Sequence, residues 1–343
     1  MRVSSILVIP STDVLAEEGR YKLATMVPRA PKRSVLNGPW PLLAAIAVLL
    51  AACGGGSTPG SSAGRLPGQG KPTIVLGDKN SGEDVLLGEL YAQAFRAKGF
   101  LVDLKPNIGG SQQIDTMFQS GQINAYPEYL GEVAAIDAAY TKPLTSEAQT
   151  EQIAKQYELS HGATVMMPVT TFSKSDEVIT LKSFAQQKNL TTIEELNRLS
   201  RLKFGAYPAA QTRYAGYLGL QLAYGLTNLQ FVSVAAGAPT YAALDSHVVE
   251  VADAFSTDPQ LASGAYTVLS DPKMIFGFQH VTVIIKTSLL DQLGPAFQQT
   301  YTSVTNLLTI NAIQSLNGAV AINGQIPATV AHSFLLANHL LSS

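Results

Sequence analysis

The sequence predicts an α/β protein made of two lobes with one shared plan, and three observations support this. The chain has 343 residues, 46% hydrophobic and 14% charged, which is enough apolar material for two cores. Short apolar runs typical of strands alternate with segments of helical periodicity. The order of strands, loops and helices in residues 73–126 returns in residues 202–255. A formal net charge of −2 without basic blocks argues against a nucleic-acid-binding protein.

The first copy of the plan begins with the apolar run Thr73-Ile74-Val75-Leu76. The turn at 77–82 follows, and after it Val85, Leu86 and Leu90 recur at helical spacing. We expect, in order, a strand at 73–76, a helix at 83–97, a strand at 100–104, a helix at 113–120 and a strand at 123–126.

The second copy begins at Leu202 and repeats the first at nearly constant spacing. We expect strands at 202–205, 231–234 and 249–255, a loop at 207–211, and helices at 214–224 and 237–244. Gly77 and Tyr126 are 49 residues apart, and Gly205 and Phe255 are 50 apart. The spacing therefore predicts that the strands ending at Tyr126 and Phe255 are equivalent.

A secretory leader precedes the folded part. Residues 40–52 are apolar apart from Pro41, and the basic residues Arg29, Lys32 and Arg33 lie before them. Thirteen residues are too few to cross a bilayer of about 30 Å as a helix, so we expect residues 1–52 to be a cleaved signal peptide. The acids in residues 1–25 are unusual for an n-region and favour a translation start at Met26 over Met1.

Cys53 is the one cysteine, which excludes an intramolecular disulfide. Leu50-Ala51-Ala52-Cys53 resembles the bacterial lipobox, so we expect Cys53 to carry a lipid and to anchor the protein to the cell membrane. Residues 53–71 are rich in Gly, Ser and Pro and are expected to be a flexible tether. The G-x-S-x-G match at 60–64 lies in this tether, without the strand and helix that a nucleophile elbow needs.

Ligands of open α/β sheets bind beyond the carboxyl ends of the strands. In the first lobe this rule places Asn80, Ser81 and Asp84 beside Tyr129. In the second it places Tyr207, Gln211 and Phe255 at the corresponding edge, so we expect a ligand cleft between the lobes. The rings and acids of Tyr126-Pro127-Glu128-Tyr129-Leu130-Gly131-Glu132 suit a small cation.

Three stretches carry a resemblance to a known family: Gly77-Asp78-Lys79-Asn80, Tyr126-Pro127-Glu128-Tyr129 and Ala254-Phe255-Ser256-Thr257-Asp258. The chain resembles, from about Thr73 onward, the glycine betaine/choline substrate-binding proteins of ABC transporters. The resemblance implies a bilobal type II periplasmic-binding fold with a two-segment hinge. Lobe 1 would comprise residues 72–169 and 280–343, lobe 2 residues 170–279, and the helices from about Ser288 on would return to lobe 1.

The resemblance also implies the function: an extracytoplasmic, monomeric binding protein that closes around an osmolyte and delivers it to an ABC permease. Quaternary ammonium ligands are held there by aromatic rings. The residues expected to bind the ligand are Asn80, Ser81, Asp84, Tyr129, Glu132, Asp176, Tyr207, Gln211, Phe255, Ser256 and Thr257.

This sequence departs from the family at three acids. Glu132 stands where many members have threonine, and Asp84 ends the segment Ser81-Gly82-Glu83-Asp84. The third acid, Asp176, lies in Lys174-Ser175-Asp176-Glu177, where the chain is expected to cross between the lobes. If these acids face the cleft, they oppose a ligand carboxylate, so we expect choline or a polyamine-like cation to fit better than glycine betaine.

Other interpretations stay open on the sequence alone. The rings at 126–129 could pack under a loop, the three acids could be solvated, and Ser256 and Thr257 could cap a turn. Arg213 could pair with an anionic ligand, but we expect it to cover Tyr217 or to pair with a surface acid. Proline, another amino acid or a polyamine could be the ligand, and a sensory ligand-binding module could use the same scaffold. The sequence shows no nucleophile and base pair and no metal-ligand spacing of histidines, so we expect no catalytic residues, metal or cofactor.

Overall fold

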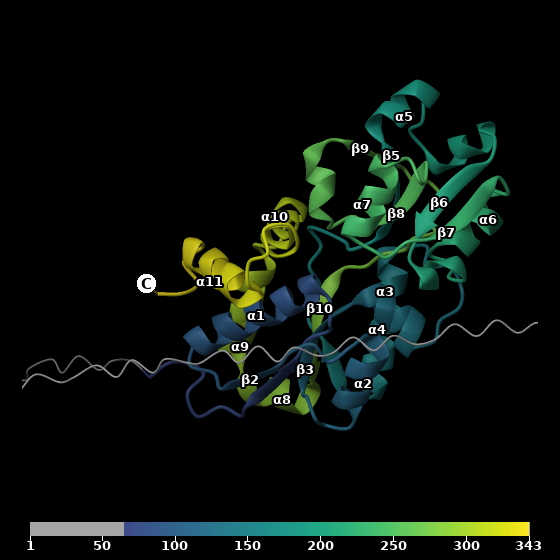
Figure 1. Ribbon diagram of the computed structural model, residues 1–343. Helices are drawn as coiled ribbons and strands as arrows, with labels where there is room; N and C mark the ends of the chain where they lie inside the picture. The colour runs from purple at the N-terminus through teal and green to yellow at the C-terminus, as the bar shows by residue number, and fades with distance from the viewer. Residues whose placement is uncertain (1–64, 343) are drawn as a thin grey trace, which may run out of the picture. The chain divides into compact units, whose positions relative to one another are not determined.

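The computed structural model describes residues 65–342, which form two five-stranded sheets covered by helices (Figure 1). The lobe 1 sheet has the order β2-β1-β3-β10-β4 and the lobe 2 sheet the order β7-β6-β8-β5-β9. The strands of lobe 1 are β1 (Ile74–Gly77), β2 (Val102–Lys105), β3 (Ala125–Tyr129), β4 (Ala163–Val165) and β10 (Val281–Lys286). Those of lobe 2 are β5 (Asp176–Leu181), β6 (Leu202–Ala206), β7 (Leu229–Ser233), β8 (Val251–Phe255) and β9 (Tyr266–Leu269).

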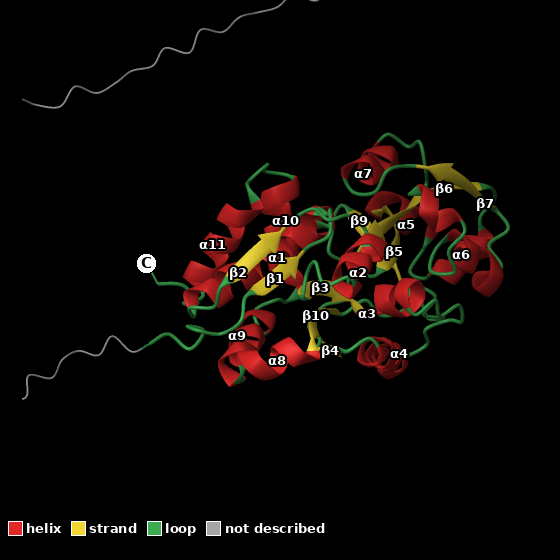
Figure 2. Cartoon of the chain, turned by 90° about the horizontal axis from the view of Figure 1, so that it is seen from below, coloured by secondary structure: helices red, strands yellow, loops and turns green. Residues whose placement is uncertain are grey.

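Helices cover both sheets (Figure 2). The helices of lobe 1 are α1 (Gly82–Ala97), α2 (Ser111–Gln119), α3 (Leu130–Glu132), α4 (Glu147–Ser160), α8 (Thr287–Leu293), α9 (Pro295–Thr305), α10 (Ile310–Ala321) and α11 (Pro327–Ala337), with a π-helical turn η1 (Val133–Asp137). Those of lobe 2 are α5 (Lys182–Lys188), α6 (Tyr217–Tyr224) and α7 (Ala238–Asp245), with 3-10 turns η2 (Ile193–Arg198), η3 (Pro208–Gln211) and η4 (Pro259–Ser263).

The two sheets repeat one topology, as the sequence predicts. In each, the first strand of the repeated plan, β1 or β6, pairs in parallel with the second and third strands of the plan. The third strand, β3 or β8, pairs antiparallel with a strand that enters from the other lobe. Leu76 pairs with Ala125 and Phe204 with Val251, and four residues later the third strands end at Tyr129 and Phe255. The predicted equivalence of these two strands is therefore confirmed, but the strand of lobe 1 ends at Tyr129 and not at Tyr126. Tyr129 is the counterpart of Phe255.

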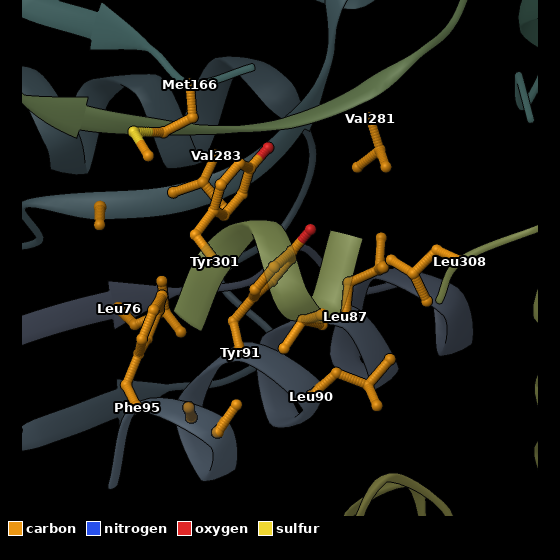
Figure 3. Close-up of a cluster of buried hydrophobic side chains, with 14 of the residues drawn as sticks. Leu76, Leu87, Leu90, Tyr91, Phe95, Met166, Val281, Val283, Tyr301 and Leu308 are labelled. Carbon is orange, nitrogen blue, oxygen red and sulfur yellow. The ribbon is translucent and has the colours of Figure 1, made fainter. Parts of the chain in front are cut away.

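The C-terminal helices return to lobe 1 and build its main core with α1. The rings of Tyr91 on α1 and Tyr301 on α9 stack at 5.4 Å between centroids (Figure 3). Phe95 stacks on Phe297 at 4.4 Å. All four side chains are fully buried. Burial of each such aromatic ring contributes roughly 1.5–3 kcal/mol, so this cluster fixes α1, whose N-terminus follows the carboxyl end of β1.

The N-terminus of α1 is held by Ser81. Its hydroxyl accepts a hydrogen bond of 3.2 Å from the Asp84 amide, the usual role of a serine before a helix. Ser81 also donates a hydrogen bond to the Asp84 carboxylate. The local sequence thus orients Asp84 as it starts the helix.

The chain crosses between the sheets twice, from β4 to β5 and from β9 to β10. These connections, residues 166–175 and 270–280, are named the first and second crossing segments below. The strands β4, β5, β9 and β10 that they join were not predicted from the sequence. Their apolar residues lie in short runs outside the repeated plan.

The end of the predicted tether is a turn packed against lobe 1. The Gly68 amide donates a hydrogen bond of 2.9 Å to the Lys98 carbonyl just after α1, so residues 65–71 belong to the folded part. The predicted leader, Cys53 and the G-x-S-x-G match lie outside the described residues. Within 65–342, no helix combines the length and apolar character needed to span a bilayer.

Candidate ligand-binding site

A cavity of about 330 Å³ lies between the two lobes, at the carboxyl ends of the parallel strands. It is named the interlobe cavity below. Its lining includes two aromatic walls, three acids and three basic residues. The lining residues are Lys79, Asn80, Asp84, Gly110, Ser111, Tyr129, Glu132, Ile136, Lys174, Asp176, Tyr207, Arg213, Phe255 and Gln279.

The aromatic walls are the last residues of equivalent strands. Tyr129 ends β3 and is only 2% exposed, and its hydroxyl donates a hydrogen bond to the Glu83 carboxylate. Phe255 ends β8, and the Tyr207 ring lies beside it at 6.1 Å between centroids. The duplicated topology therefore brings one ring from each lobe to the same cavity.

A buried ion pair lies beneath Tyr129. The ammonium of Lys79, two residues after β1, donates hydrogen bonds to the fully buried Glu128 carboxylate and, at 3.4 Å, to the Ser111 hydroxyl. It also lies 4.8 Å from the centroid of the Tyr129 ring. Burial acts to lower the pKa of Lys79, but the carboxylates of Asp84 and Glu128 outweigh it and hold that pKa above its usual value.

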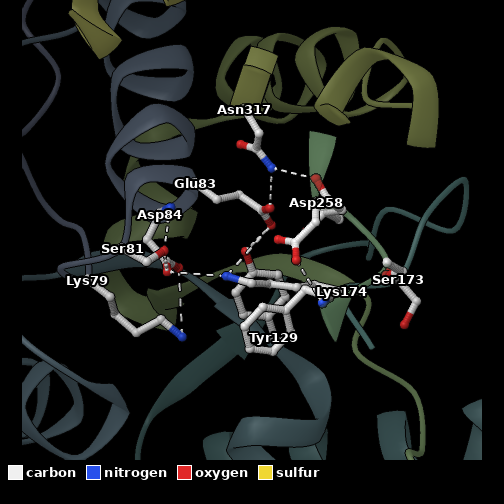
Figure 4. Close-up of polar contacts among 12 residues, drawn as sticks. Lys79, Ser81, Glu83, Asp84, Tyr129, Ser173, Lys174, Asp258 and Asn317 are labelled. Atoms are coloured by element: carbon white, nitrogen blue, oxygen red, sulfur yellow. Dashed lines mark hydrogen bonds and ion pairs between the residues drawn. The ribbon is translucent and has the colours of Figure 1, made fainter. Parts of the chain in front are cut away.

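A second ammonium, that of Lys174, lies close to both aromatic walls, and its position beside Tyr129 is seen in Figure 4. It is 4.9 Å from the centroid of the Tyr129 ring and 5.4 Å from that of Phe255. Burial opposes its charge, yet Glu83 and Asp84 raise the pKa of Lys174. In return, Lys79 and Lys174 hold the pKa of Asp84 below its usual value against the effect of burial. Both ammonium groups are charged at neutral pH.

On the lobe 2 side, Arg213 donates hydrogen bonds of 3.0 Å to the Glu132 carboxylate of lobe 1 and to the Tyr207 hydroxyl. The Tyr207 hydroxyl donates in turn to Asp176 at 3.2 Å. Burial raises the pKa of Asp176 to about 6, although Arg213 acts to lower it. Burial and the neighbouring Asp176 also raise the pKa of Asp253 well above its usual value.

The structure brings seven of the residues named from the sequence to the interlobe cavity, and four lie elsewhere. Ser81 and Thr257 line an adjoining hollow next to Asn317. Ser256 donates its hydroxyl to the Ser173 carbonyl and so fastens the first crossing segment. Gln211 lines a separate surface hollow with Tyr217. The seven cavity residues are Asn80, Asp84, Tyr129, Glu132, Asp176, Tyr207 and Phe255.

Sequence reasoning missed the basic side of the site. Lys79 stood in the predicted turn at 77–82 and Lys174 in the segment 174–177, but only the neighbouring acids were interpreted. Arg213 pairs with Glu132 across the lobes rather than covering Tyr217. The interlobe cavity therefore offers three cations to an anionic group, and these cations largely balance its acids.

Comparison with known proteins gives a consistent result. Residues 72–337 match the family described as the substrate binding domain of the ABC-type glycine betaine transport system. The glycine betaine-binding protein YehZ of Escherichia coli (strain K12) is 24% identical over 285 residues, covering 79% of this chain and 92% of that protein.

A glycine-betaine-binding protein of Pseudomonas aeruginosa is 24% identical over 281 residues, covering 78% of this chain and 89% of its own. Among solved structures, a glycine betaine/carnitine/choline ABC transporter protein superposes with a TM-score of 0.69 at 21% identity, covering 78% of this chain and all of that one. This likeness confirms the bilobal type II periplasmic-binding fold. The chain belongs to the family of substrate-binding domains of ABC-type glycine betaine transport systems.

Proposed function

We propose that this protein captures a quaternary ammonium osmolyte of the choline, glycine betaine or carnitine type outside the cytoplasm and delivers it to the permease of an ABC importer. The observation that carries the proposal is the pair of rings, Tyr129 and Phe255, that end equivalent strands and face one interlobe cavity. Family membership supports the transport role, since the family is a transport component.

The chemistry of the cavity suits such a ligand. A trimethylammonium group has no N–H to donate, so only ring faces and nearby carboxylates bind it, at roughly 0.5–2 kcal/mol per ring. Tyr129, Phe255 and Tyr207 supply rings, and Asp84, Glu132 and Asp176 supply carboxylates. The three rings supply roughly 1.5–6 kcal/mol of the about 8 kcal/mol that a micromolar dissociation constant requires, and the carboxylates add to it.

Hinge closure provides the mechanism. A ligand in the cavity touches Tyr129 of lobe 1 and Phe255 of lobe 2, so it stabilises the arrangement in which both are close. The two crossing segments are the covalent connections that a rotation of the lobes would bend. The closed form would then dock on the permease, and no covalent chemistry is required.

A zwitterion is the second candidate, favoured by a specific observation. Lys79, Lys174 and Arg213 all line the cavity, so a ligand carboxylate finds cations as well as acids there. The sequence-based preference for choline over glycine betaine rested on unbalanced acids. With the basic residues present, glycine betaine, carnitine and proline are candidates beside choline and the polyamines.

The lipid anchor at Cys53 is part of the proposal. It rests on the lipobox and on the leader before it. Cys53→Ser should release the protein from the membrane fraction into the extracytoplasmic fluid. Retention of the variant in the membrane fraction would contradict the anchor.

The test of the ligand class is isothermal titration calorimetry of the purified mature protein with choline, glycine betaine, carnitine, proline and spermidine. We expect micromolar binding of at least one quaternary ammonium compound, and its loss in Tyr129→Ala. If none of them binds, the proposed ligand class is wrong. If Tyr129→Ala binds as the wild type does, the ring is not part of the site.

A further inference from the structure

Lys174 lies on the first crossing segment, and the backbone on both sides of it is fixed. Its own amide donates to the Gln279 carbonyl at 3.0 Å. The Ser175 amide donates to the Ser256 hydroxyl at 3.1 Å, and that hydroxyl donates to the Ser173 carbonyl. With the backbone fixed in this way, the Lys174 side chain extends to the Tyr129 ring (Figure 4) and to that of Phe255.

The Lys174 ammonium is held by charges and ring faces at a distance. Glu83 Oε1 and Asp84 Oδ2 lie 4.0 and 3.9 Å from it, and the Tyr129 and Phe255 centroids lie 4.9 and 5.4 Å away. Within residues 65–342, its Nζ makes no hydrogen bond, although its side chain is only 15% exposed. Carboxylates and rings at such distances, without N–H bonds, are the surroundings that a trimethylammonium group requires.

Lys79 provides the contrast within the same site. Its ammonium is equally close to the Tyr129 ring, but it is hydrogen-bonded to Glu128 and Ser111 in the buried interior of lobe 1. Lys79 is therefore a structural partner of Glu128. Lys174, which reaches in from the crossing segment and holds no such bond, is the ammonium that can leave.

We propose that Lys174 is a tethered cation that occupies the ligand's cation position in the empty protein, and that a ligand cation binds by displacing it. The inference rests on the proposed function. The exchange replaces one positive charge by another, so Glu83 and Asp84 keep a counter-charge in both states. Because Lys174 is covalently attached, it competes at a high effective concentration and lowers the apparent affinity for every cation that uses this position.

The test compares tetramethylammonium binding, measured by calorimetry, in the wild type, Lys174→Ala and Lys174→Arg. Removal of the tethered charge should raise the affinity at least tenfold, which equals about 1.4 kcal/mol. Lys174→Arg keeps a cation and should bind as weakly as the wild type. Lys188→Ala, at an exposed lysine on α5, is the matched control and should change nothing.

The gain in tetramethylammonium affinity should vanish in the double variant Lys174→Ala with Tyr129→Leu, because one aromatic wall of the cation position is lost. Thermal unfolding of each variant reports whether it is folded. If Lys174→Ala is not folded, Lys174→Arg serves as the test. Tight tetramethylammonium binding to the arginine variant would then overturn the proposal. An unchanged or lower affinity in folded Lys174→Ala would also overturn it.

Tetramethylammonium tests the displacement separately from the natural ligand. If Lys174→Ala gains affinity for this probe while no osmolyte binds the wild type, Lys174 is the tethered cation and the proposed ligand class alone is wrong. If osmolytes bind the wild type and Lys174→Ala shows no gain for the probe, the ligand class stands and the tethered cation is overturned.

Discussion

Arg213 and Glu132 join the two lobes directly, through a hydrogen bond of 3.0 Å between the guanidinium of one lobe and the carboxylate of the other. Two further hydrogen bonds join the lobes from α10: Asn317 Nδ2 donates to the Thr257 carbonyl at 3.0 Å, and Gln314 Nε2 to the Ser256 carbonyl at 2.9 Å. The lobes are thus held together by side chains of lobe 1 and of lobe 2.

Removal of the arginine should loosen this arrangement. The pair is partly exposed, at 30% and 21%, so its loss costs on the order of 1 kcal/mol or less. Arg213→Met should increase the radius of gyration of the ligand-free protein in small-angle X-ray scattering and weaken ligand binding by about three- to tenfold. Arg198→Met, which removes an exposed arginine on η2, is the control. Scattering and affinity equal to the wild type would contradict a role in closure.

The aromatic wall from lobe 2 should contribute binding energy of its own. Phe255→Leu keeps an apolar side chain but removes the ring face, which is worth roughly 0.5–2 kcal/mol toward a cation. We expect the affinity for the quaternary ammonium ligand to fall about 3- to 30-fold, with little change in thermal stability, because Phe255 is only partly buried. Full affinity in the variant would place the ligand away from β8.

Cation binding should depend on pH through Asp176. Its pKa is raised to about 6, so the carboxyl is largely neutral at pH 5 and charged at pH 7.5. Affinity for a cation should therefore rise across this interval in the wild type. Asp176→Asn should show a weaker dependence and match the wild type best at pH 5. The buried neighbour Asp253 shares the titration, so the apparent midpoint belongs to the pair.

The same shift has a consequence for stability, with a defined sign. A carboxyl whose pKa is higher in the folded than in the unfolded state favours folding when protonated. Its contribution is lost as the pH rises from about 4 to above 6. Asp176→Asn should therefore gain stability relative to the wild type over this interval, measured by urea unfolding. A constant difference between the two proteins would contradict the raised pKa.

The buried pair of Lys79 and Glu128 should be costly to break. Lys79→Met leaves the Glu128 carboxylate fully buried without its cation, a loss of about 3–5 kcal/mol in such pairs. Burial already raises the pKa of Glu128 despite Lys79, so the variant should recover part of the loss at low pH by protonating this group. Urea unfolding at pH 5 and pH 8 measures the stability that the variant loses at each pH. An equal loss at both would contradict the recovery by protonation of Glu128.

Much of the architecture could be predicted because the chain contains the plan twice. Glycines at the strand ends and apolar periodicity placed β1, α1, β6 and β8 within two residues of their observed bounds. The third strand of lobe 1 was cut short at Tyr126 because Pro127 and Glu128 do not read as strand residues. Glu128 is tolerated there because Lys79 neutralises it.

The site was harder to predict than the fold. Rings and acids were found because they stand in recognisable stretches at strand ends. Lys174 and Arg213 reach the cavity from a crossing segment and from the loop before α6, where spacing says nothing about the direction of a side chain. The charge balance of the cavity depends on these tertiary contacts, so counting acids along the sequence gave an incomplete answer.

The strands that enter from the other lobe begin opposite the aromatic walls: Val281 of β10 pairs with Tyr129, and Asp176 of β5 pairs with Phe255. Both connections thus end next to the interlobe cavity. A rotation of the lobes about them would move atoms in proportion to their distance from these connections, so β2 and β7, at the far edges of the two sheets, would move further than the two rings. A small change in the separation of Tyr129 and Phe255 would therefore become a larger displacement at the outer surfaces of both lobes.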